Sequence, residues 1–431
     1  MEVFAERRKR LLETIRGVAI VAAMPAAVRN ADIEHPYRQD SDLYYFTGFE
    51  EPDAVLVLST VHPEHRAVIF VRPRDSKREQ WDGARAGVEG ARERLGVDAS
   101  YPVAELAQRL PDLLMGAPEL HYQLGYRRAL DEQVLAALLH ARARRRSPLP
   151  RPRAIVHPEG SWHEMRLRKD PHEVEVMRRA AAISVEAHVE AMRAARVGQY
   201  EYELEAVIRQ VFLRHGATRV AYEPIVASGE NATVLHYVSN RRRIGHGELV
   251  LIDAACEFGY YASDVTRTFP VSGRFSEPQR RVYEVVLEAQ QRALAVVRPG
   301  ATVDEVHRIA LRSLVEGMLR LGLMRGDADA IMAEESYKRF YMHPTSHWLG
   351  MDVHDVGAYF QDGQSRTLEL GMALTIEPGL YIGANDEDAP LEYRGIGVRI
   401  EDALVVTADG HENLTAAVPK SVAEVEQACA R

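Results

Sequence analysis

The chain has 431 residues, of which 46% are hydrophobic and 27% charged, and a formal net charge of −9 at pH 7. That length suits two or three domains, and the acidic balance gives no reason to expect nucleic-acid binding. No run approaches the roughly 20 apolar residues that a membrane span needs, so we expect no membrane function.

The N-terminal part predicts a mixed α/β domain, because strand-like runs occur at residues 18–23, 54–58 and 67–71. A basic cluster at 7–10 precedes the first run, as in a secretory signal, but a charged segment at 11–16 separates the two. The only two cysteines, Cys256 and Cys429, cannot form a disulfide framework. We therefore expect a cytoplasmic protein.

Three prolines among arginines at residues 145–153 predict an exposed connection between domains. We place the boundary at Trp162, which divides the chain into an N-terminal domain, 1–162, and a second domain, 163–431.

Two amphipathic helices should open the second domain. Asp170, Pro171 and Glu173 form an N-cap, a proline at the first helical position and a capping box. A second helix, with apolar residues at helical spacing from 204 to 212, should stop at Gly216. Mostly antiparallel strands follow, so the fold class is α+β.

The first pair of candidate ligands is Asp253 and Asp264. Residues 249–254 and 260–269 read as strands of a hairpin with Phe258-Gly259 as its turn, which places the two carboxylates directly opposite each other. Two carboxylates at so short a distance repel each other unless a cation or a shared proton lies between them. The alternative is a hydrogen-bonded aspartate pair that caps turns.

Glu377 and Glu401 repeat this pattern, because each ends or interrupts a strand-like apolar run, at 372–377 and 397–401. Arg399 should share a strand face with Glu401. It could orient a ligating carboxylate from behind, or form an ordinary ion pair on a solvated face.

The segment 343–355 supplies three histidines, His343, His347 and His354, beside Trp348. Imidazole both binds borderline metals and transfers protons near neutral pH. Chemistry alone does not say which histidine is a ligand, and His236 is a further candidate.

Other catalytic templates are absent: the chain has no GxSxG, no HExxH and no complete dinucleotide fingerprint. Four carboxylates and one imidazole are instead what two divalent cations would need.

The strings LIDAACEFGYYASDVTRTFPV, HPTSHWLGMDVHDVG, LTIEPGLYI and YRGIGVRIED resemble those of the dinuclear-metal "pita-bread" peptidases, and specifically of the Xaa-Pro aminopeptidase (aminopeptidase P) family. The string YRQDSDLYYFTGF, at 37–49, is similar to the N-terminal domain of that family. The resemblance spans nearly the whole chain and implies a pita-bread catalytic domain behind a mixed α/β domain.

The resemblance implies that Asp253, Asp264, His347, Glu377 and Glu401 bind the metals, with Asp264 and Glu401 bridging them. It implies that the other three histidines, His236, His343 and His354, line the site and handle substrate and protons. Two Mn²⁺ ions are expected, with Zn²⁺ or Co²⁺ as possible occupants.

The expected reaction is release of the N-terminal residue from peptides with proline second, through attack of a metal-activated hydroxide. Glu377 is the candidate for accepting its proton, and His343 and His354 for stabilising the oxyanion or protonating the prolyl nitrogen.

Trp348 and Tyr381 could offer flat surfaces for a proline ring. The resemblance implies a homodimer or homotetramer, in which Trp81 could narrow access to a neighbouring active site; its other interpretation is a core tryptophan.

Prolidase, which cleaves Xaa-Pro dipeptides only, shares the metal set and is the main alternative. A remote alternative is a catalytically inactive pita-bread module that only binds other proteins. Such a module would lose ligands, whereas this chain has all five.

Overall fold

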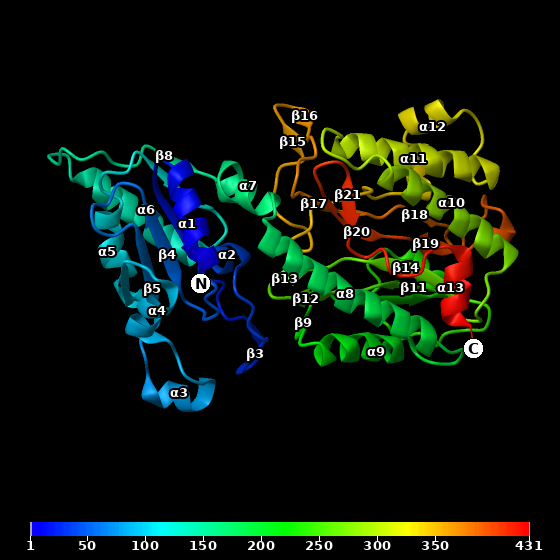
Figure 1. Ribbon diagram of the computed structural model, residues 1–431, viewed down its shortest axis with the longest axis horizontal. Coiled ribbons are helices and arrows are strands. Elements are labelled where there is room, and N and C mark those ends of the chain that lie inside the picture. The colour runs from blue at the N-terminus through cyan, green and yellow to red at the C-terminus, as the bar shows by residue number, and fades with distance from the viewer. Residues whose placement is uncertain (1, 431) are drawn as a thin grey trace. The chain divides into compact units, whose positions relative to one another are not determined.

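The computed structural model describes residues 2–430, and the chain forms two compact units, Met1–Glu164 and Met165–Arg431 (Figure 1). Within the described residues, no helix has the length and apolar character that crossing a membrane requires. Each unit has its own sheets and hydrophobic core.

The first unit has a six-stranded sheet with helices around it and a separate two-stranded sheet. Its helices are α1 (Glu2–Thr14), α2 (Ser41–Thr47), α3 (Ser76–Asp82), α4 (Gly87–Leu95), α5 (Leu106–Leu113) and α6 (Arg128–Ala143). Its strands are β1 (Gly17–Ala22), β2 (Val28–Asn30), β3 (Ile33–Glu34), β4 (Val55–Ser59), β5 (Ala67–Val71), β6 (Ala99–Pro102), β7 (Glu119–His121) and β8 (Ala154–Val156). Helix α7 (Trp162–Leu167) contains the division between the units.

The sheet has the order β6-β5-β4-β1-β7-β8 and mixes parallel with antiparallel pairs. All residues of β1, β4 and β5 are buried, as expected for strands covered on both faces. These are the three strands that the apolar runs predicted, so the prediction of a mixed α/β domain is confirmed.

Helix α3 stands apart from the sheet of its unit (Figure 1) and has no buried residue. Trp81 lies on it with 87% of its surface exposed. The interpretation of Trp81 as a core tryptophan is therefore wrong.

The second unit contains the longer helices and several small sheets. Its helices are α8 (Pro171–Ala194), α9 (Glu201–Arg214), α10 (Glu277–Leu294), α11 (Val303–Arg320), α12 (Ala328–Ala333) and α13 (Val422–Cys429). Its strands are β9 (Arg219–Val220), β10 (Ile225–Ser228), β11 (Leu249–Asp253), β12 (Cys256–Phe258), β13 (Tyr261–Ala262), β14 (Thr266–Pro270), β15 (Phe360–Gln361), β16 (Gln364–Ser365), β17 (Ala373–Ile376), β18 (Gly379–Tyr381), β19 (Gly397–Arg399), β20 (Asp402–Val406) and β21 (His411–Asn413). The short 3₁₀ helices of the chain are η1 (Val103–Glu105), η2 (Pro158–Gly160), η3 (Gly229–Thr233), η4 (Ser336–Arg339) and η5 (Leu391–Tyr393).

The predicted start of α8 is confirmed in detail. The Asp170 carboxylate accepts a hydrogen bond from the Glu173 backbone N–H at 2.9 Å, and the Glu173 carboxylate accepts one from the Asp170 N–H at 3.0 Å. This capping box satisfies two N–H groups that a helix start leaves without partners. The next helix, α9, also ends as predicted, before Gly216 with its φ of +80°.

Figure 1 shows α8 beside α9 and α10 beside α11, with the sheets β10-β11-β14 and β17-β20-β21 between these helix pairs. Every strand pair of this unit is antiparallel, as in β10-β11-β14 and β17-β20-β21. Helices over antiparallel sheets are the α+β arrangement that the sequence predicted.

The predicted hairpin exists, but its predicted register is wrong. Gly259 and Tyr260, with φ of +56° and +70°, form the turn, and Phe258 pairs with Tyr261. Two consecutive residues with positive φ are typical of a type I′ turn. The turn thus lies one residue later than predicted.

The shift changes how the two aspartates meet. Asp253 pairs with Thr266, so Asp264, two residues earlier, is its diagonal neighbour on the same face rather than its direct partner. The prediction that the two carboxylates lie on one face survives the shift.

The two glutamates are placed by the pairing of β17 with β20. Ile376 pairs with Asp402. Glu377 directly follows β17 and Glu401 directly precedes β20, so the two glutamates lie opposite each other at the next position of this antiparallel pair. A hydrogen bond from the Glu401 N–H to the Thr266 carbonyl, at 3.1 Å, joins this strand end to the start of β14. The two sheets therefore bring all four carboxylates to one place.

Candidate metal centre

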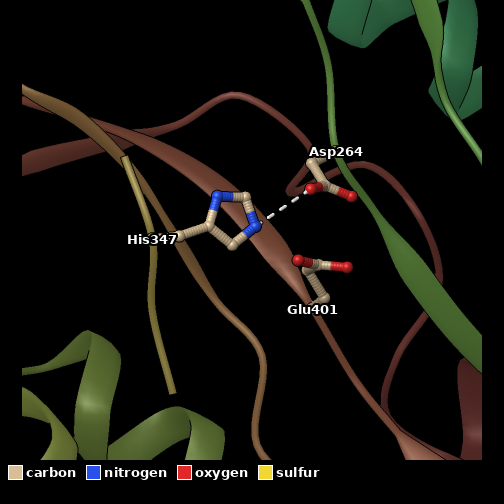
Figure 2. A group of neighbouring side chains, drawn as sticks. All are labelled: Asp264, His347 and Glu401. Carbon is tan, nitrogen blue, oxygen red and sulfur yellow. Dashed lines mark ion pairs between the residues drawn. The ribbon is translucent and has the colours of Figure 1, made fainter. Parts of the chain in front are cut away.

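Asp264, His347 and Glu401 form the centre of the site (Figure 2). Each offers a ligand atom, and these atoms lie within 4.8 Å of one another. His347 Nε2 is 3.3 Å from Asp264 Oδ2, the ion pair drawn as a dashed line in Figure 2. Carboxylate oxygens and an imidazole nitrogen suit Mn²⁺, Zn²⁺ and related cations.

The backbone and ring of His347 are both held in place. Its backbone exchanges hydrogen bonds with Thr375 of β17, from the His347 N–H to Thr375 Oγ1 at 3.2 Å and from the Thr375 N–H to the His347 carbonyl at 3.0 Å. Its Nδ1 donates to the Trp348 carbonyl at 2.9 Å. This bond fixes the ring and leaves Nε2 facing the carboxylates, as in many metal-binding histidines.

The charge state of His347 follows from its neighbours. Burial lowers the pKa of His347, but the hydrogen bond to Asp264 and the nearby Glu377 carboxylate outweigh burial and raise the pKa to about 9. Without a cation, a proton on this imidazole therefore offsets part of the negative charge of the site.

Glu377 lies between two histidines. Its Oε1 is 3.7 Å from His347 Nε2, and its Oε2 is 3.7 Å from His343 Nδ1. Burial raises the pKa of Glu377 to about 7, although His347 and Arg399 act in the opposite direction. A carboxyl with such a pKa can both accept and release a proton near neutral pH.

Asp253 is held by Arg399, whose Nη2 donates to Asp253 Oδ2 at 2.6 Å. The other oxygen, Oδ1, is buried and has no hydrogen-bond partner among residues 2–430. A buried acceptor without a partner is costly, and a cation would satisfy it.

Glu401 is 2% exposed and accepts a hydrogen bond from Thr266 Oγ1 at 2.7 Å. Burial raises the pKa of Glu401 well above its usual value, and the carboxylates of Asp264, Glu377 and Asp253 raise it further. Carboxylates that raise one another's pKa in this way favour cations among them. The donor set thus fits a divalent-metal centre.

His343 has a defined orientation beside this centre. Its Nδ1 donates to the Pro344 carbonyl at 2.8 Å, so the Tyr381 hydroxyl donates to its Nε2, also at 2.8 Å. Arg399 Nη1 in turn donates to the Tyr381 hydroxyl at 3.1 Å. Burial and the positive charge of Arg399 lower the pKa of His343 to about 4, so this imidazole is neutral near pH 7.

The other two histidines are more exposed. The ring of His354 meets that of His347 with 4.4 Å between centroids and 76° between planes. Burial and the His347 charge lower the pKa of His354. His236, in a turn after η3, adds to the lowering of the pKa of both His343 and His354, so it lies within electrostatic range of both.

Arg399 holds a candidate ligand from behind, as one of its two interpretations expected, but that carboxylate belongs to Asp253; Arg399 reaches Glu401 through Thr266, to which its Nε donates at 3.2 Å. Arg399 is 4% exposed, so its other interpretation, an ion pair on a solvated face, is wrong.

Two expectations about aromatic residues also need correction. Trp348 is fully buried and stacks on Tyr359, with 5.3 Å between ring centroids. Its ring therefore cannot pack against a substrate proline.

Tyr381 is likewise only 3% exposed, so its ring does not offer the flat surface expected of it. Its hydroxyl instead links Arg399 to His343. This residue acts on the site through polar contacts.

Sequence reasoning missed two residues at the centre. Tyr222 donates from its hydroxyl to Asp264 Oδ1 at 2.6 Å, and Thr266 bonds to Glu401. Thr266 could have been found from its place two residues after Asp264 on a strand. No sequence signal identifies Tyr222, because its contact partner, Asp264, lies 42 residues away in the sequence.

Comparison with known proteins assigns the chain. Residues 175–408 match the model of metallopeptidase family M24, and residues 4–121 match the aminopeptidase P N-terminal domain. The chain belongs to metallopeptidase family M24. It is therefore a hydrolase, and the predicted fold, an M24 pita-bread domain behind an aminopeptidase P-type domain, is confirmed.

Close M24 relatives span the whole chain. The Xaa-Pro aminopeptidase of Escherichia coli K12 is 46% identical over 98% of this chain and 96% of its own length. The structure of Pseudomonas aeruginosa aminopeptidase PepP has a TM-score of 0.95 and 46% identity, with 99% and 97% of the two chains covered. A zinc-substituted E. coli aminopeptidase P bound to product has the same TM-score and identity, with 99% and 98% covered.

Proposed function

We propose that this chain releases the N-terminal residue from peptides with proline in second position, using two divalent cations bound by Asp253, Asp264, His347, Glu377 and Glu401. The observation that carries the proposal is the meeting of Asp264, His347 and Glu401 within 4.8 Å, in a chain 46% identical to an Xaa-Pro aminopeptidase over nearly its whole length. These comparisons favour the aminopeptidase over the prolidase and the binding module.

Asp264, Glu401 and His347 would hold the cations at the centre of the site, where their ligand atoms meet. Asp253 and Glu377 lie beside that centre, and each would bind one cation. Mn²⁺ fits a set of mostly oxygen donors with one imidazole, and Zn²⁺ or Co²⁺ would also be accepted. Bound cations supply Lewis acidity, which lowers the pKa of water and polarises the scissile carbonyl.

Proton transfer is the work of the chain's own side chains. Glu377, with its pKa near 7, accepts a proton from the attacking water. Glu377 then passes this proton on toward the leaving group. The prolyl nitrogen leaves as a secondary amine, so it needs a proton donor.

The remaining histidines act on the substrate. We assign His343 to the oxyanion or the prolyl nitrogen; neutral His343 has a single N–H, on Nδ1, and would have to exchange its bond to the Pro344 carbonyl for a bond to the substrate. His354, in contact with the His347 ring, is placed to share this task. We assign His236, which is exposed and lies within electrostatic range of His343 and His354, to holding the peptide beyond the proline.

The first unit would act in an oligomer, a homodimer or homotetramer, in which Trp81 narrows access to a neighbouring active site. An almost fully exposed tryptophan on a helix with no buried residue supports this proposal. We also propose the division into domains 1–162 and 163–431, close to the division between the compact units. Two free, buried cysteines support a reducing compartment, the cytoplasm.

Mass spectrometry of reaction products tests the activity. The Mn²⁺-loaded protein is given an Xaa-Pro dipeptide, an Xaa-Pro-Yaa tripeptide and a longer Xaa-Pro peptide, each with and without chelator. Release of the first residue from the two longer peptides, lost with chelator, is the expected result. Cleavage of the dipeptide alone would identify a prolidase, and no cleavage with any metal would identify a binding module.

A further inference from the structure

The segment between His347 and His354 turns back on itself, because the two imidazoles at its ends are in contact. No regular strand or helix is present from residue 348 to residue 355. The position of His354 must therefore come from side chains and isolated backbone hydrogen bonds.

The two histidines are held differently. His347 is fixed through Thr375 of β17 and the Trp348 carbonyl. His354 is exposed, and its imidazole has no hydrogen bond to any residue in the range 2–430. The contact of the His354 ring with His347 therefore depends on the neighbouring backbone, which is that of Asp355.

Asp355 is a buried anchor for that backbone. Its carboxylate accepts hydrogen bonds from Arg166 Nη2 at 2.5 Å and from Lys169 Nζ at 3.0 Å. Its backbone N–H donates to the Trp348 carbonyl at 2.9 Å, which closes the turn. The side chains of Asp355, Arg166 and Lys169 are each no more than 2% exposed, so these charge-assisted bonds are shielded from water.

The rest of the segment wraps closely around this carboxylate. Arg166 Nη2 also donates to Asp352 Oδ2 at 2.8 Å. The Gly350 N–H donates to the Asp352 carbonyl at 3.1 Å. A Cβ at Gly350 would collide with Asp355 Oδ2, so only glycine allows this close approach.

Arg166 and Lys169 lie at the start of the second unit. Arg166 lies on α7, and Lys169 directly precedes Asp170, the N-cap of α8. The Lys169 N–H also donates to the Gly371 carbonyl at 2.8 Å. The segment carrying His354 is thus fastened to the start of a 24-residue helix.

We propose that Asp355 is a positioning residue for the reaction: held by Arg166 and Lys169, it fixes the backbone that keeps the His354 imidazole against His347. This inference rests on the role proposed for His354. It goes further by naming the side chains that hold His354 and by predicting that they act on catalysis only through it.

A double-mutant cycle separates this role from that of a buried ion pair that only stabilises the fold. In the Mn²⁺-loaded enzyme, Asp355→Asn should lower kcat for an Xaa-Pro-Yaa tripeptide by about 10- to 100-fold, because small displacements of a reacting group have effects of this size. KM and metal content should stay close to those of the wild type. In a His354→Ala background, the same change should alter kcat by less than about threefold, because groups that act as a unit are not additive.

A matched control is Glu173→Gln, because Glu173 is also buried and hydrogen-bonded, to Tyr261 at 2.8 Å, but belongs to the α8 capping box. It should lower the thermal unfolding midpoint without changing kcat. If Asp355→Asn does not fold, Lys169→Met replaces it in the cycle: Arg166 still holds one carboxylate oxygen, so this variant should fold, and loss of the Lys169 bond should lower kcat only while His354 is present.

Each outcome decides a separate point. Equal losses of kcat from Asp355→Asn in both backgrounds, or loss of metal, would overturn the positioning role while leaving the proposed function intact. A normal kcat for His354→Ala alone would overturn the proposed role of His354, and with it the inference.

Discussion

Arg399 binds Asp253 through a single 2.6 Å contact between Nη2 and Oδ2, which leaves Asp253 Oδ1 buried and without a hydrogen-bond partner among residues 2–430. The same guanidinium donates to Thr266 and Tyr381. Arg399 therefore contacts one candidate ligand, Asp253, directly and a second, Glu401, through Thr266. We infer that Arg399 aims the free oxygen of Asp253 at the metal.

Arg399→Lys should weaken Mn²⁺ binding by about 10- to 100-fold, the usual cost of losing a residue that orients a metal ligand. Lysine keeps the charge but lacks the planar fork that reaches Asp253, Thr266 and Tyr381 together. Isothermal titration calorimetry of the metal-free protein measures the change.

Arg168→Lys is the matched control. Arg168 also binds a carboxylate, that of Glu369, at 2.8 Å, but both side chains are about 40% exposed, so the pair contributes little. This variant should bind Mn²⁺ like the wild type. An Arg399→Lys protein with unchanged affinity would show that Asp253 needs no orienting partner.

Asp264→Ala should abolish activity and lower the metal content, because it removes a carboxylate from the centre of the candidate metal site. It also removes the partner of His347, at 3.3 Å, and of the Tyr222 hydroxyl, at 2.6 Å. Plasma mass spectrometry of the purified variant gives metal per chain, and tripeptide cleavage gives activity. An active variant with full metal content would rule out the dinuclear assignment.

The candidate site could be proposed largely from sequence because its candidate ligands lie at strand ends, where an acid in an apolar run is conspicuous. Asp253, Glu377 and Glu401 all interrupt such runs. The register of the hairpin could not be predicted, because Gly259-Tyr260 and Phe258-Gly259 are both plausible turns. Tyr260 adopts a φ of +70°, which is uncommon for a residue with a side chain.

Burial of the aromatic residues was the least predictable feature. Trp348 lies in a segment full of catalytic residue types, yet it packs against Tyr359 in the core. Trp81 lies in a segment with no such signal, yet it is 87% exposed. The burial of a large side chain depends on which elements pack around it, and that is set by contacts distant in sequence.

The metal-free protein should lose about 2 kcal/mol of its free energy of unfolding between pH 7 and pH 9, where His347, whose pKa is raised to about 9, releases its proton. A group with a folded-state pKa above its unfolded value stabilises the fold most at low pH, and this stabilisation is lost as pH rises through the folded pKa. The pKa of Glu377 is raised to about 7, so this group also stabilises the fold less as pH rises, over a lower pH range. Urea titrations in the presence of chelator measure the trend.

Saturating Mn²⁺ should remove this trend, because metal binding requires unprotonated ligands and becomes tighter as pH rises. His347→Gln should flatten it in the metal-free protein. Below pH 6.5, His188 and His343 should make the free energy of unfolding fall as pH falls, because burial lowers the pKa of each to about 4. A metal-free protein equally stable at pH 7 and pH 9 would contradict the charge arrangement inferred for the site.

Trp81→Ala should change the free energy of unfolding by less than about 0.5 kcal/mol, because the side chain is 87% exposed and α3 buries no residue. If Trp81 narrows a neighbouring active site, the variant should nevertheless raise KM for Xaa-Pro-Yaa tripeptides several-fold at unchanged metal content. Leu139→Ala, at a 67% exposed position on α6, is the control and should change neither quantity.

Mixed oligomers decide whether Trp81 acts across a subunit interface. Asp264→Ala subunits keep Trp81 but lack a working metal centre, whereas Trp81→Ala subunits keep the metal centre. Co-expression of the two should restore a low KM in the mixed oligomer, because Trp81 of an inactive subunit would narrow the active site of its active neighbour. If the mixture shows only the KM of Trp81→Ala, the tryptophan acts within its own chain. A low KM for the single variant would remove Trp81 from the site.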